Sequence, residues 1–451
     1  MRRMERGALA SKDIMSRFFR SSNKDTFEKK VQAFANDYLR VCRYMVKVQD
    51  PDKFFPQKLI GGLVSEALLL EEFLDWYGAK NNNRWYFFRE LCAAILHIGN
   101  ANKYLTYLVH RLDSYELPHS GNYKESLERY IIVINKMMIV IAKAVIEECV
   151  HTGLKMPPGP FQESDFPEVI GGTLLDFDID DEDKDLQKKN IVRNASEFLN
   201  IARDFEHFQV YRHLDPDQMR ELVPASINEV NIRRFEMLIH NLQSQFDSYI
   251  IQGGFRRGNQ RLKQLRSYYS VIFRTLQVTG ALLHFYERHL KEDSYKHVYK
   301  ETRIRFFEML DVDEILDTIV NFGVYQVSHF FTVGIQHAQQ ILNEFIERSS
   351  ITVGIPQTRG FHSRPSLMVA KIVQHYGGEV ELVVNGDRFD ASSVLDIQWA
   401  GGKIQKEEIT QVVFEGDTRA LHDLEILAGV NYGEDSMGKG VPLPDELAYL
   451  R

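Results

Sequence analysis

The stretch Gly360-Phe361-His362-Ser363-Arg364-Pro365-Ser366 decides how the last quarter of this chain is interpreted. Glycine supplies a backbone angle that other residues avoid and proline is tolerated in a first helical turn, so we expect a helix to begin at the histidine. Unpaired N–H groups at a helix start attract anions, and Arg364 adds a fixed positive charge. Histidine titrates near neutrality, so its neutral form is available as a nucleophile. The stretch therefore predicts a phosphate site centred on His362.

The residues around this stretch predict a small sheet covered by helices. Val380, Leu382 and Val384 alternate with charged residues as in a half-buried strand, and Asn385-Gly386 is the strongest short hairpin signal. The predicted order over residues 351–428 is β-α-β-β-α-β-α, an α+β arrangement with its helices on one side. The other expected elements are strands at 351–353, 388–389 and 409–414 and helices at 362–376, at 393–399 and after Asp417.

Residues 351–428 resemble HPr, the histidine phosphocarrier of the bacterial phosphoenolpyruvate-dependent phosphotransferase system, over less than a fifth of the chain. The run Phe361-His362-Ser363-Arg364-Pro365 is similar to the family's leucine-histidine-alanine-arginine-proline active-site sequence, which a glycine also precedes. The resemblance implies an HPr-like open-faced sandwich in which His362 is phosphorylated on a ring nitrogen and Arg364 pairs with the phosphoryl group. It implies a phospho-donor partner of the enzyme I type and no cofactor.

A second segment of this region, residues 391–394, also resembles HPr. Ala391-Ser392-Ser393-Val394 resembles the segment that holds the regulatory serine of some HPr proteins, which implies that Ser393 is the target of a serine kinase. From the residues alone, a helix cap or first-turn serine is slightly favoured for Ser393, because the flanking lysine is absent and serine is common at that place in a helix. The docking surface that the resemblance implies consists of Phe361, Val394, Leu395 and Lys371.

Several positions depart from the family pattern. Residues 356–359 lengthen the loop before the histidine, Ser392 stands where lysine is common, and Gln374 and Asp396 stand where docking lysines are common. Residues 351–451 carry nine Lys or Arg against fifteen Asp or Glu, a net charge of −6. Such an acidic surface disfavours docking to the acidic face that the upstream kinase component normally presents.

Two functional accounts remain open at this point. In the first, the chain is a phosphotransferase-system-linked regulator, in which His362 accepts a phosphoryl group and the helical region is the partner-binding or output module. In the second, the chain is a non-enzymatic helical scaffold with a degenerate HPr-like docking domain. At most, then, the chain is a phosphoryl carrier with a phosphohistidine intermediate, and no motif favours a small-molecule enzyme.

The totals of the chain are those of an ordinary soluble protein with two or three domains. The 451 residues are 44% hydrophobic and 26% charged, and the net charge of −8 gives no basic field for nucleic acid. Cys42, Cys92 and Cys149 are widely spaced in apolar segments, which argues against a disulfide framework and for a cytoplasmic setting. The most apolar segment, 131–146, is too short and too charged for a transmembrane helix.

The sequence does not determine the oligomeric state, and a homo-oligomer is one of the states that it allows.

Apolar residues recur at spacings of three and four through residues 25–350, which predicts a large all-α region of long antiparallel helices. We expect two halves, either related by an internal repeat or only similar by chance. The expected segments are a flexible basic arm (1–24), a helical bundle half (25–154), an acidic Pro-containing linker (155–188), a second bundle half (189–350), the HPr-like domain (351–428) and a flexible tail (429–451). The expected helices are 25–48, 57–79, 83–112, 122–152, 186–207, 226–251, 258–291, 295–309 and 312–348.

No metal site is expected. Glu148 and His151 have the Glu-x-x-His spacing of carboxylate-bridged metal bundles, but such a site needs two helical copies of the motif, and the other copy, Glu116 to His119, contains proline. Two further pairs at helical spacing are better explained as interface or core residues. They are His329 with His337, and Glu236 with His240.

Overall fold

In the part of the chain that the structure describes, the regular elements are helical up to residue 345, and strands and helices alternate thereafter. The computed structural model describes residues 27–52, 55–117, 120–159, 161, 165, 184–250, 260–291 and 296–450. The predicted basic arm at 1–24 and most of the predicted linker at 155–188 lie outside these residues. Among the described helices, none combines the length and the apolar character that crossing a membrane requires.

Four long helices form the first half of the helical region. They are α2 (Phe27–Val48), α3 (Gln57–Trp76), α4 (Tyr86–Leu112) and α5 (Ser120–Thr152). Helix α2 shows why these segments fold as they do: Val31, Ala35, Tyr38, Cys42 and Met45 recur at spacings of three and four and are all buried. Each of the four helices packs on two neighbours of this group, as the predicted bundle requires.

The second half is built in the same way, with additional short elements. Its long helices are α6 (Lys184–Phe205), α8 (Glu229–Tyr249), α9 (Gln260–Phe285) and α12 (Tyr325–Phe345). The short ones are α7 (Pro216–Leu222), α10 (His297–Met309) and α11 (Val312–Asp317), and π turns follow α9 (Tyr286–Leu290) and precede α12 (Thr318–Val324). Helix α7 was not predicted; its seven residues are too few for a periodic apolar pattern to be recognised.

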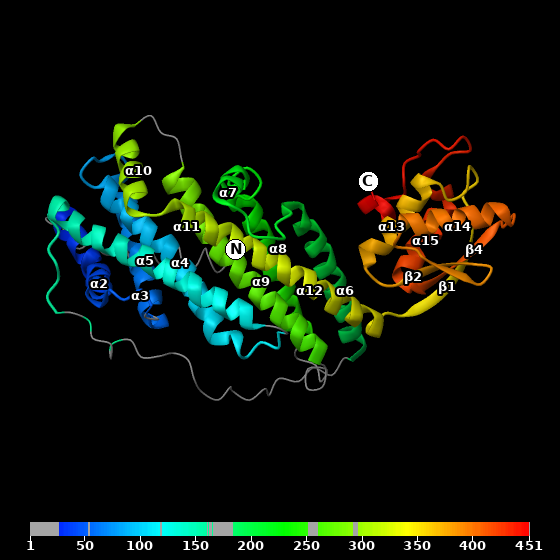
Figure 1. The fold of residues 1–451 in the computed structure, drawn as a ribbon, viewed down its shortest axis with the longest axis horizontal. Coiled ribbons are helices and arrows are strands. Elements are labelled where there is room, and N and C mark those ends of the chain that lie inside the picture. Colours follow the sequence, from blue (N-terminus) through cyan, green and yellow to red (C-terminus); the bar gives the residue numbers. More distant parts are fainter. Residues whose placement is uncertain are drawn as a thin grey trace.

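One apolar core runs through both halves. Helix α4 of the first half packs along α9 of the second, and the buried side chains of α2 to α12 form one continuous cluster. Figure 1 shows the long helices lying side by side in an elongated stack, with the C-terminal region attached at one end.

The C-terminal region contains a four-stranded antiparallel sheet in the order β1-β4-β2-β3. Its elements are β1 (Arg348–Gly354), α13 (Ser363–Tyr376), β2 (Val380–Val384), β3 (Asp387–Asp390), α14 (Val394–Lys406), β4 (Gln411–Asp417) and α15 (Thr418–Gly429). The predicted element order is confirmed. Asn385 and Gly386 both have positive φ angles, 49° and 89°, as the predicted hairpin turn requires. The buried side chains of sheet and helices form a second core of their own.

The segment after Gly429 differs from our expectation of a flexible tail. A short helical turn at Asn431–Gly433, an isolated bridge between Glu434 and Gly440, and a last turn at Asp445–Leu450 give it regular structure. Leu447 and Leu450 are buried in the second core. The Gly and Pro content of this segment reflects tight turns across the domain surface instead of a lack of structure.

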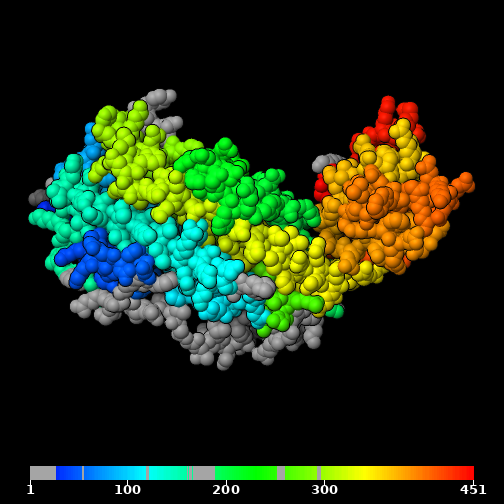
Figure 2. Space-filling model, in the orientation of Figure 1, coloured from blue at the N-terminus to red at the C-terminus, as the bar shows by residue number. Residues whose placement is uncertain are grey.

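The two regions touch at the C-terminal end of α13. Arg203 of α6 donates to the carbonyl of Gln374 at 2.7 Å, and the Ser196 hydroxyl donates to the carbonyl of Tyr376 at 2.7 Å. Arg419 of α15 donates to the same serine oxygen at 3.1 Å. Figure 2 shows the α+β region, in orange and red, projecting from one end of the helical region over this limited contact.

Gly377 makes this close approach feasible. It ends α13 with a φ of 73°, a left-handed conformation that glycine adopts without strain. A Cβ atom at this position would lie 2.4 Å from the Leu199 side chain of α6. The helix end therefore needs glycine both for its turn and for its packing on the helical region.

Candidate functional site

The predicted helix start at His362 is confirmed, and an unusual loop precedes it. Arg359 and Gly360 have φ angles of 60° and 57°, so two consecutive residues are left-handed. The His362 N–H group donates to the Gly360 carbonyl at 2.9 Å, and the His362 carbonyl accepts from Ser366 at 3.1 Å. His362 is thus the N-cap residue of α13. The residue therefore lies at the positive end of that helix, and its side chain makes no capping hydrogen bond.

A buried carboxylate engages one nitrogen of this imidazole. Nε2 of His362 lies 3.1 Å from Oε2 of Glu434, whose side chain has no exposed surface, while the His362 side chain is 32% exposed. The other oxygen of Glu434 is buried without a hydrogen-bond partner in the described part of the chain. A carboxylate that accepts from Nε2–H selects the tautomer in which Nδ1 carries the lone pair. In that tautomer the lone pair of the His362 ring is on Nδ1.

Glu434 belongs to a short segment, residues 431–441, which we call the strap. Backbone pairing of Glu434 with Gly440 closes the strap into a loop. Gly440 lies against the guanidinium of Arg364, since a Cβ atom there would lie 2.0–2.3 Å from three guanidinium atoms. The two ends of one bridge thus contact His362 and Arg364, the two residues that the sequence pairs in a phosphate site.

The strap is fixed to the domain at its base. Tyr432 is buried, packs edge-on against Phe361 with ring centroids 5.2 Å apart, and donates its hydroxyl to the Gly354 carbonyl at 2.7 Å. Burial raises the pKa of Tyr432, which keeps the phenol protonated as a donor. Asn431 accepts from the Gln357 N–H group at 3.0 Å. The loop at 356–359 therefore holds the start of the strap through this hydrogen bond.

The predicted docking surface is only partly at the surface. Phe361 is buried in the second core, so its assignment to a docking surface was wrong: the aromatic side chain packs inward against Tyr432 and Phe414. Lys371 and Leu395 are exposed, Leu395 by 65%, and Val394 is half-buried. Trp399, one turn after Leu395 on α14, is 73% exposed and was not predicted.

Ser393 is the N-cap residue of α14. Its hydroxyl accepts from the Asp396 N–H group at 3.3 Å. This geometry agrees with the capping alternative of the sequence analysis. The neighbouring Ser392 donates to Asp390 at 2.9 Å. Ser393 remains a predicted modification site, and its hydroxyl has a structural role in the unmodified chain.

The other motifs of the sequence have structural partners. Glu148 is buried, pairs with Arg305 at 3.0 Å and lies 3.8 Å from His151, in a cleft of about 580 Å³. His119 lies outside the described residues. His329 and His337 pack against the rings of Phe330 and Tyr268. The remaining pair is separated, because Glu236 binds Arg233 at 2.7 Å while His240 stacks on Phe273.

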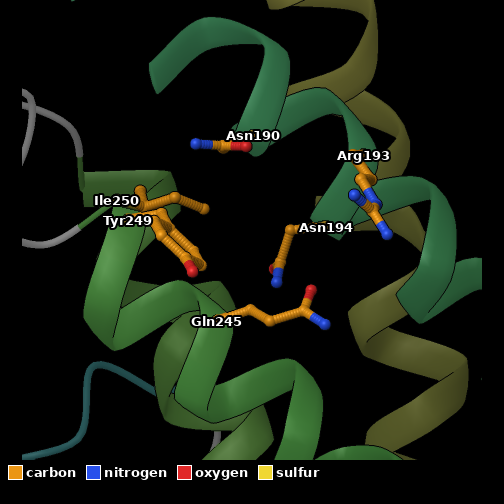
Figure 3. Close-up of a pocket in the computed structure, with 6 residues that line it drawn as sticks. All are labelled: Asn190, Arg193, Asn194, Gln245, Tyr249 and Ile250. Atoms are coloured by element: carbon orange, nitrogen blue, oxygen red, sulfur yellow. The ribbon is translucent and has the colours of Figure 1, made fainter. Parts of the chain in front are cut away.

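A small pocket lies between α6 and α8, with a volume of about 220 Å³. Asn190 and Asn194 of α6 face Gln245 and Tyr249 of α8 across it (Figure 3). Both polar atoms of Asn194 are used within the fold, since the amide donates to the Leu242 carbonyl at 3.0 Å and accepts from Tyr269 at 2.7 Å. This lining offers hydrogen bonds and no acid–base pair.

A larger cleft of about 840 Å³ lies where the helical and α+β regions meet. Glu379 makes two polar contacts there: it accepts from Asn343 of α12 across the boundary at 2.8 Å, and it binds Arg348 of β1 at 3.2 Å. Helix α13 is 14 residues long, which puts His362 about 20 Å from this junction. Among the residues that the structure describes, the side-chain contact on the His362 ring comes from Glu434 of the strap.

Sequence reasoning missed two groups of residues. Glu434 and the strap lie more than 70 residues after His362, in a segment whose composition gave no sign of a site. The helical region also brings together His97, His284 and His289, whose spacing suggested no common face. Comparison with known proteins yields no match to a family model, a curated protein or a solved structure.

Proposed function

We propose that the chain is a phosphotransferase-linked regulatory protein whose C-terminal HPr-like domain accepts a phosphoryl group on Nδ1 of His362. The observation that carries this proposal is the 3.1 Å contact between Nε2 of His362 and the buried Glu434, which leaves Nδ1 free at the start of α13. The element order and the antiparallel sheet are compatible with the resemblance to HPr.

The groups around His362 suit phosphoryl transfer. Nδ1 attacks phosphorus in line as the bond to the donor breaks, and the reaction needs fixed positive charge for the equatorial oxygens. Arg364 and the first N–H groups of α13 provide this charge, each charge-assisted bond being worth about 1.5–3 kcal/mol. Glu434 is a positioning residue that holds the ring and its tautomer.

Labelling with phosphoenolpyruvate and a purified enzyme I tests the proposal on the full chain. We expect acid-labile, alkali-stable label on the protein, and no label on H362A. The matched control is H422A, which removes an exposed histidine of α15 in the same domain. A reference HPr labelled in parallel establishes that the donor is active. An unlabelled wild-type chain, or an H362A variant labelled like the wild type, contradicts the proposal.

The alternative of a docking scaffold is favoured by one observation. Leu395 and Trp399 are one turn apart on α14 and strongly exposed, as in the apolar centre of a protein interface. We expect W399A to weaken partner binding on either account. The variant H362A distinguishes the two accounts. If the domain is a scaffold, H362A leaves partner binding unchanged. If it is a carrier, partner binding by H362A no longer depends on phosphorylation.

A further inference from the structure

Three histidines of the helical region meet at one place. His97 lies in α4, His284 at the end of α9, and His289 in the π turn that follows. The ring centroid of His97 is 4.1 Å from that of His284 and 5.6 Å from that of His289, and the last two are 5.8 Å apart. One ring nitrogen of each lies within 4.8 Å of those of the other two. Three imidazoles at this spacing are able to reach a single ion.

A carboxylate holds Nδ1 of two of these rings. Oε1 of Glu229 lies 2.8 Å from Nδ1 of His284, and Oε2 of Glu90 lies 2.7 Å from Nδ1 of His289. A carboxylate on one ring nitrogen fixes the tautomer and leaves Nε2 with its lone pair. Metal-binding histidines almost always have such a partner, which orients the ring and makes it a better ligand.

The π turn explains how residues five apart share a site. Lys291 donates its N–H group to the Tyr286 carbonyl at 2.9 Å, the five-residue hydrogen bond of a π helix. In a regular α-helix, His284 and His289 would point to different sides. The wider turn returns His289 to the side on which His284 lies. Single π turns of this kind occur frequently at functional sites.

The carboxylate of Glu90 is itself anchored. Nη1 of Arg89 donates to its other oxygen at 2.9 Å, and Arg89 also binds Asp75 at 2.8 Å and contacts Glu71. Arg89 and Glu90 are both buried. Burying such a network costs free energy that well-packed apolar residues would not cost. The network is the outer support expected around a preorganised ligand set.

We propose that His97, His284 and His289 bind one divalent transition-metal ion, with zinc as the best match. Neutral imidazole suits zinc, copper, iron and nickel, whereas calcium and magnesium require oxygen ligands. Three nitrogen ligands leave a fourth tetrahedral position for water. Zinc–nitrogen bonds of 2.0–2.1 Å place the nitrogens about 3.3 Å apart, so binding draws the rings together by up to about 1.5 Å.

The position of the site indicates what the ion does. His97 belongs to the first half of the helical region, and the other two histidines belong to the second. Glu229 is the first residue of α8, so its contact with His284 connects that helix to the three histidines as well. The ion therefore joins α4, α8 and α9 across the line where the two halves pack, and stabilises their relative position.

Zinc titration of the chelator-treated full chain, in competition with a chromogenic chelator, tests this inference. We expect one equivalent to bind and the thermal unfolding temperature of the helical region to rise. H97A and H284A should each lower the affinity at least 100-fold. The control H337A removes a half-buried histidine of the same region that contacts none of the three, and should bind zinc like the wild type.

A second measurement keeps the test independent of variant folding. The wild-type chain loaded with cobalt(II) should show the visible absorption bands of a tetrahedral nitrogen-ligated ion. Zinc binding to the wild type no tighter than to a variant lacking all three histidines overturns the inference, as does a cobalt complex without tetrahedral bands. Equal loss of affinity in H337A and H284A overturns it as well. Helical circular dichroism of each variant shows which comparisons rest on folded protein.

Discussion

Two histidines in this chain each form a hydrogen bond with a glutamate carboxylate. The nitrogen-to-oxygen distances of the two bonds are similar, but the surroundings of the two pairs differ. Glu434 lies 3.1 Å from His362, and Glu90 lies 2.7 Å from His289. The second oxygen of Glu90 is held by Arg89 at 2.9 Å. The second oxygen of Glu434 is buried without a hydrogen-bond partner among the residues that the structure describes.

The comparison teaches that the pair itself does not determine the chemistry. In both cases the carboxylate selects the tautomer and leaves one nitrogen free. The His289 ring lies beside two other imidazoles, an arrangement suited to a cation, whereas His362 caps a helix beside a guanidinium, an arrangement suited to an anion. The anchoring also differs, since the Glu90 carboxylate belongs to the ion-pair network of Arg89 and the Glu434 carboxylate belongs to the strap.

Removal of Arg89 should give the largest effect. R89M leaves Glu71 and Glu90 with little solvent exposure and without the guanidinium that pairs with both, which should lower the free energy of unfolding by about 3–5 kcal/mol. Chemical denaturation followed by helical circular dichroism measures this loss. The control R234M breaks an exposed ion pair with Asp204, worth less than about 1 kcal/mol. An equal loss of unfolding free energy in the two variants would show that the ion pairs around Glu90 stabilise the fold no more than an exposed ion pair does.

Loss of Arg364 should come next. R364A removes a charge-assisted contact to the transferred group, so the labelling rate of His362 should fall by about 10- to 100-fold. R388A removes an arginine of β3 that pairs with Glu381 and Glu415, and should label at the wild-type rate. A labelling rate unaffected by R364A would remove the guanidinium from the proposed anion site.

Changing Glu229 should weaken the metal site without affecting His362. E229Q keeps the shape of the side chain and loses its charge, so zinc affinity should fall by about 10- to 100-fold while labelling stays at the wild-type rate. Glu236 lies two turns later on the same helix and binds Arg233, which makes E236Q the matched control. Unchanged zinc affinity in E229Q would mean that the carboxylate does not orient His284.

The smallest expected effect belongs to Glu434. In E434Q the amide oxygen still accepts a hydrogen bond, but the bond loses its charge assistance, which is worth about 1 kcal/mol. The labelling rate should therefore fall about fivefold, and zinc affinity should not change. E446Q, at an exposed position of the same C-terminal segment, is the control. A faster rate in E434Q would mean that the carboxylate hinders the incoming phosphoryl group instead of positioning the ring.

The sequence predicted those parts of the fold that depend on residues close together in the chain. Asn385-Gly386 and the alternation of Val380, Leu382 and Val384 specify a hairpin and a buried face within a few residues. The start of α13 at His362 followed in the same way from glycine and proline. Helix ends in the first 350 residues agreed within a few residues, because apolar spacing alone defines a packed helix.

The parts that depend on distant contacts were not predictable. Glu434 reaches His362 through the pairing of the strap with itself, and no local pattern marks that fold-back. His284 and His289 are five residues apart, a spacing that places them on different sides of a regular helix. They share a side only because a π turn lies between them, and the sequence does not indicate that turn. Phe361 was expected at a docking surface, and its ring contacts with the distant Tyr432 and Phe414 explain why it points inward.

Helix α13 links the junction between the two regions to the strap, and its length makes it a lever. Its C-terminal end is fixed to α6, through hydrogen bonds of Arg203 and Ser196, while its other end carries His362. A tilt of about 5° relative to the strap displaces the far end of a helix about 20 Å long by about 2 Å. That displacement exceeds what a 3.1 Å hydrogen bond tolerates. A small movement of α6 would thus make or break the contact between His362 and Glu434.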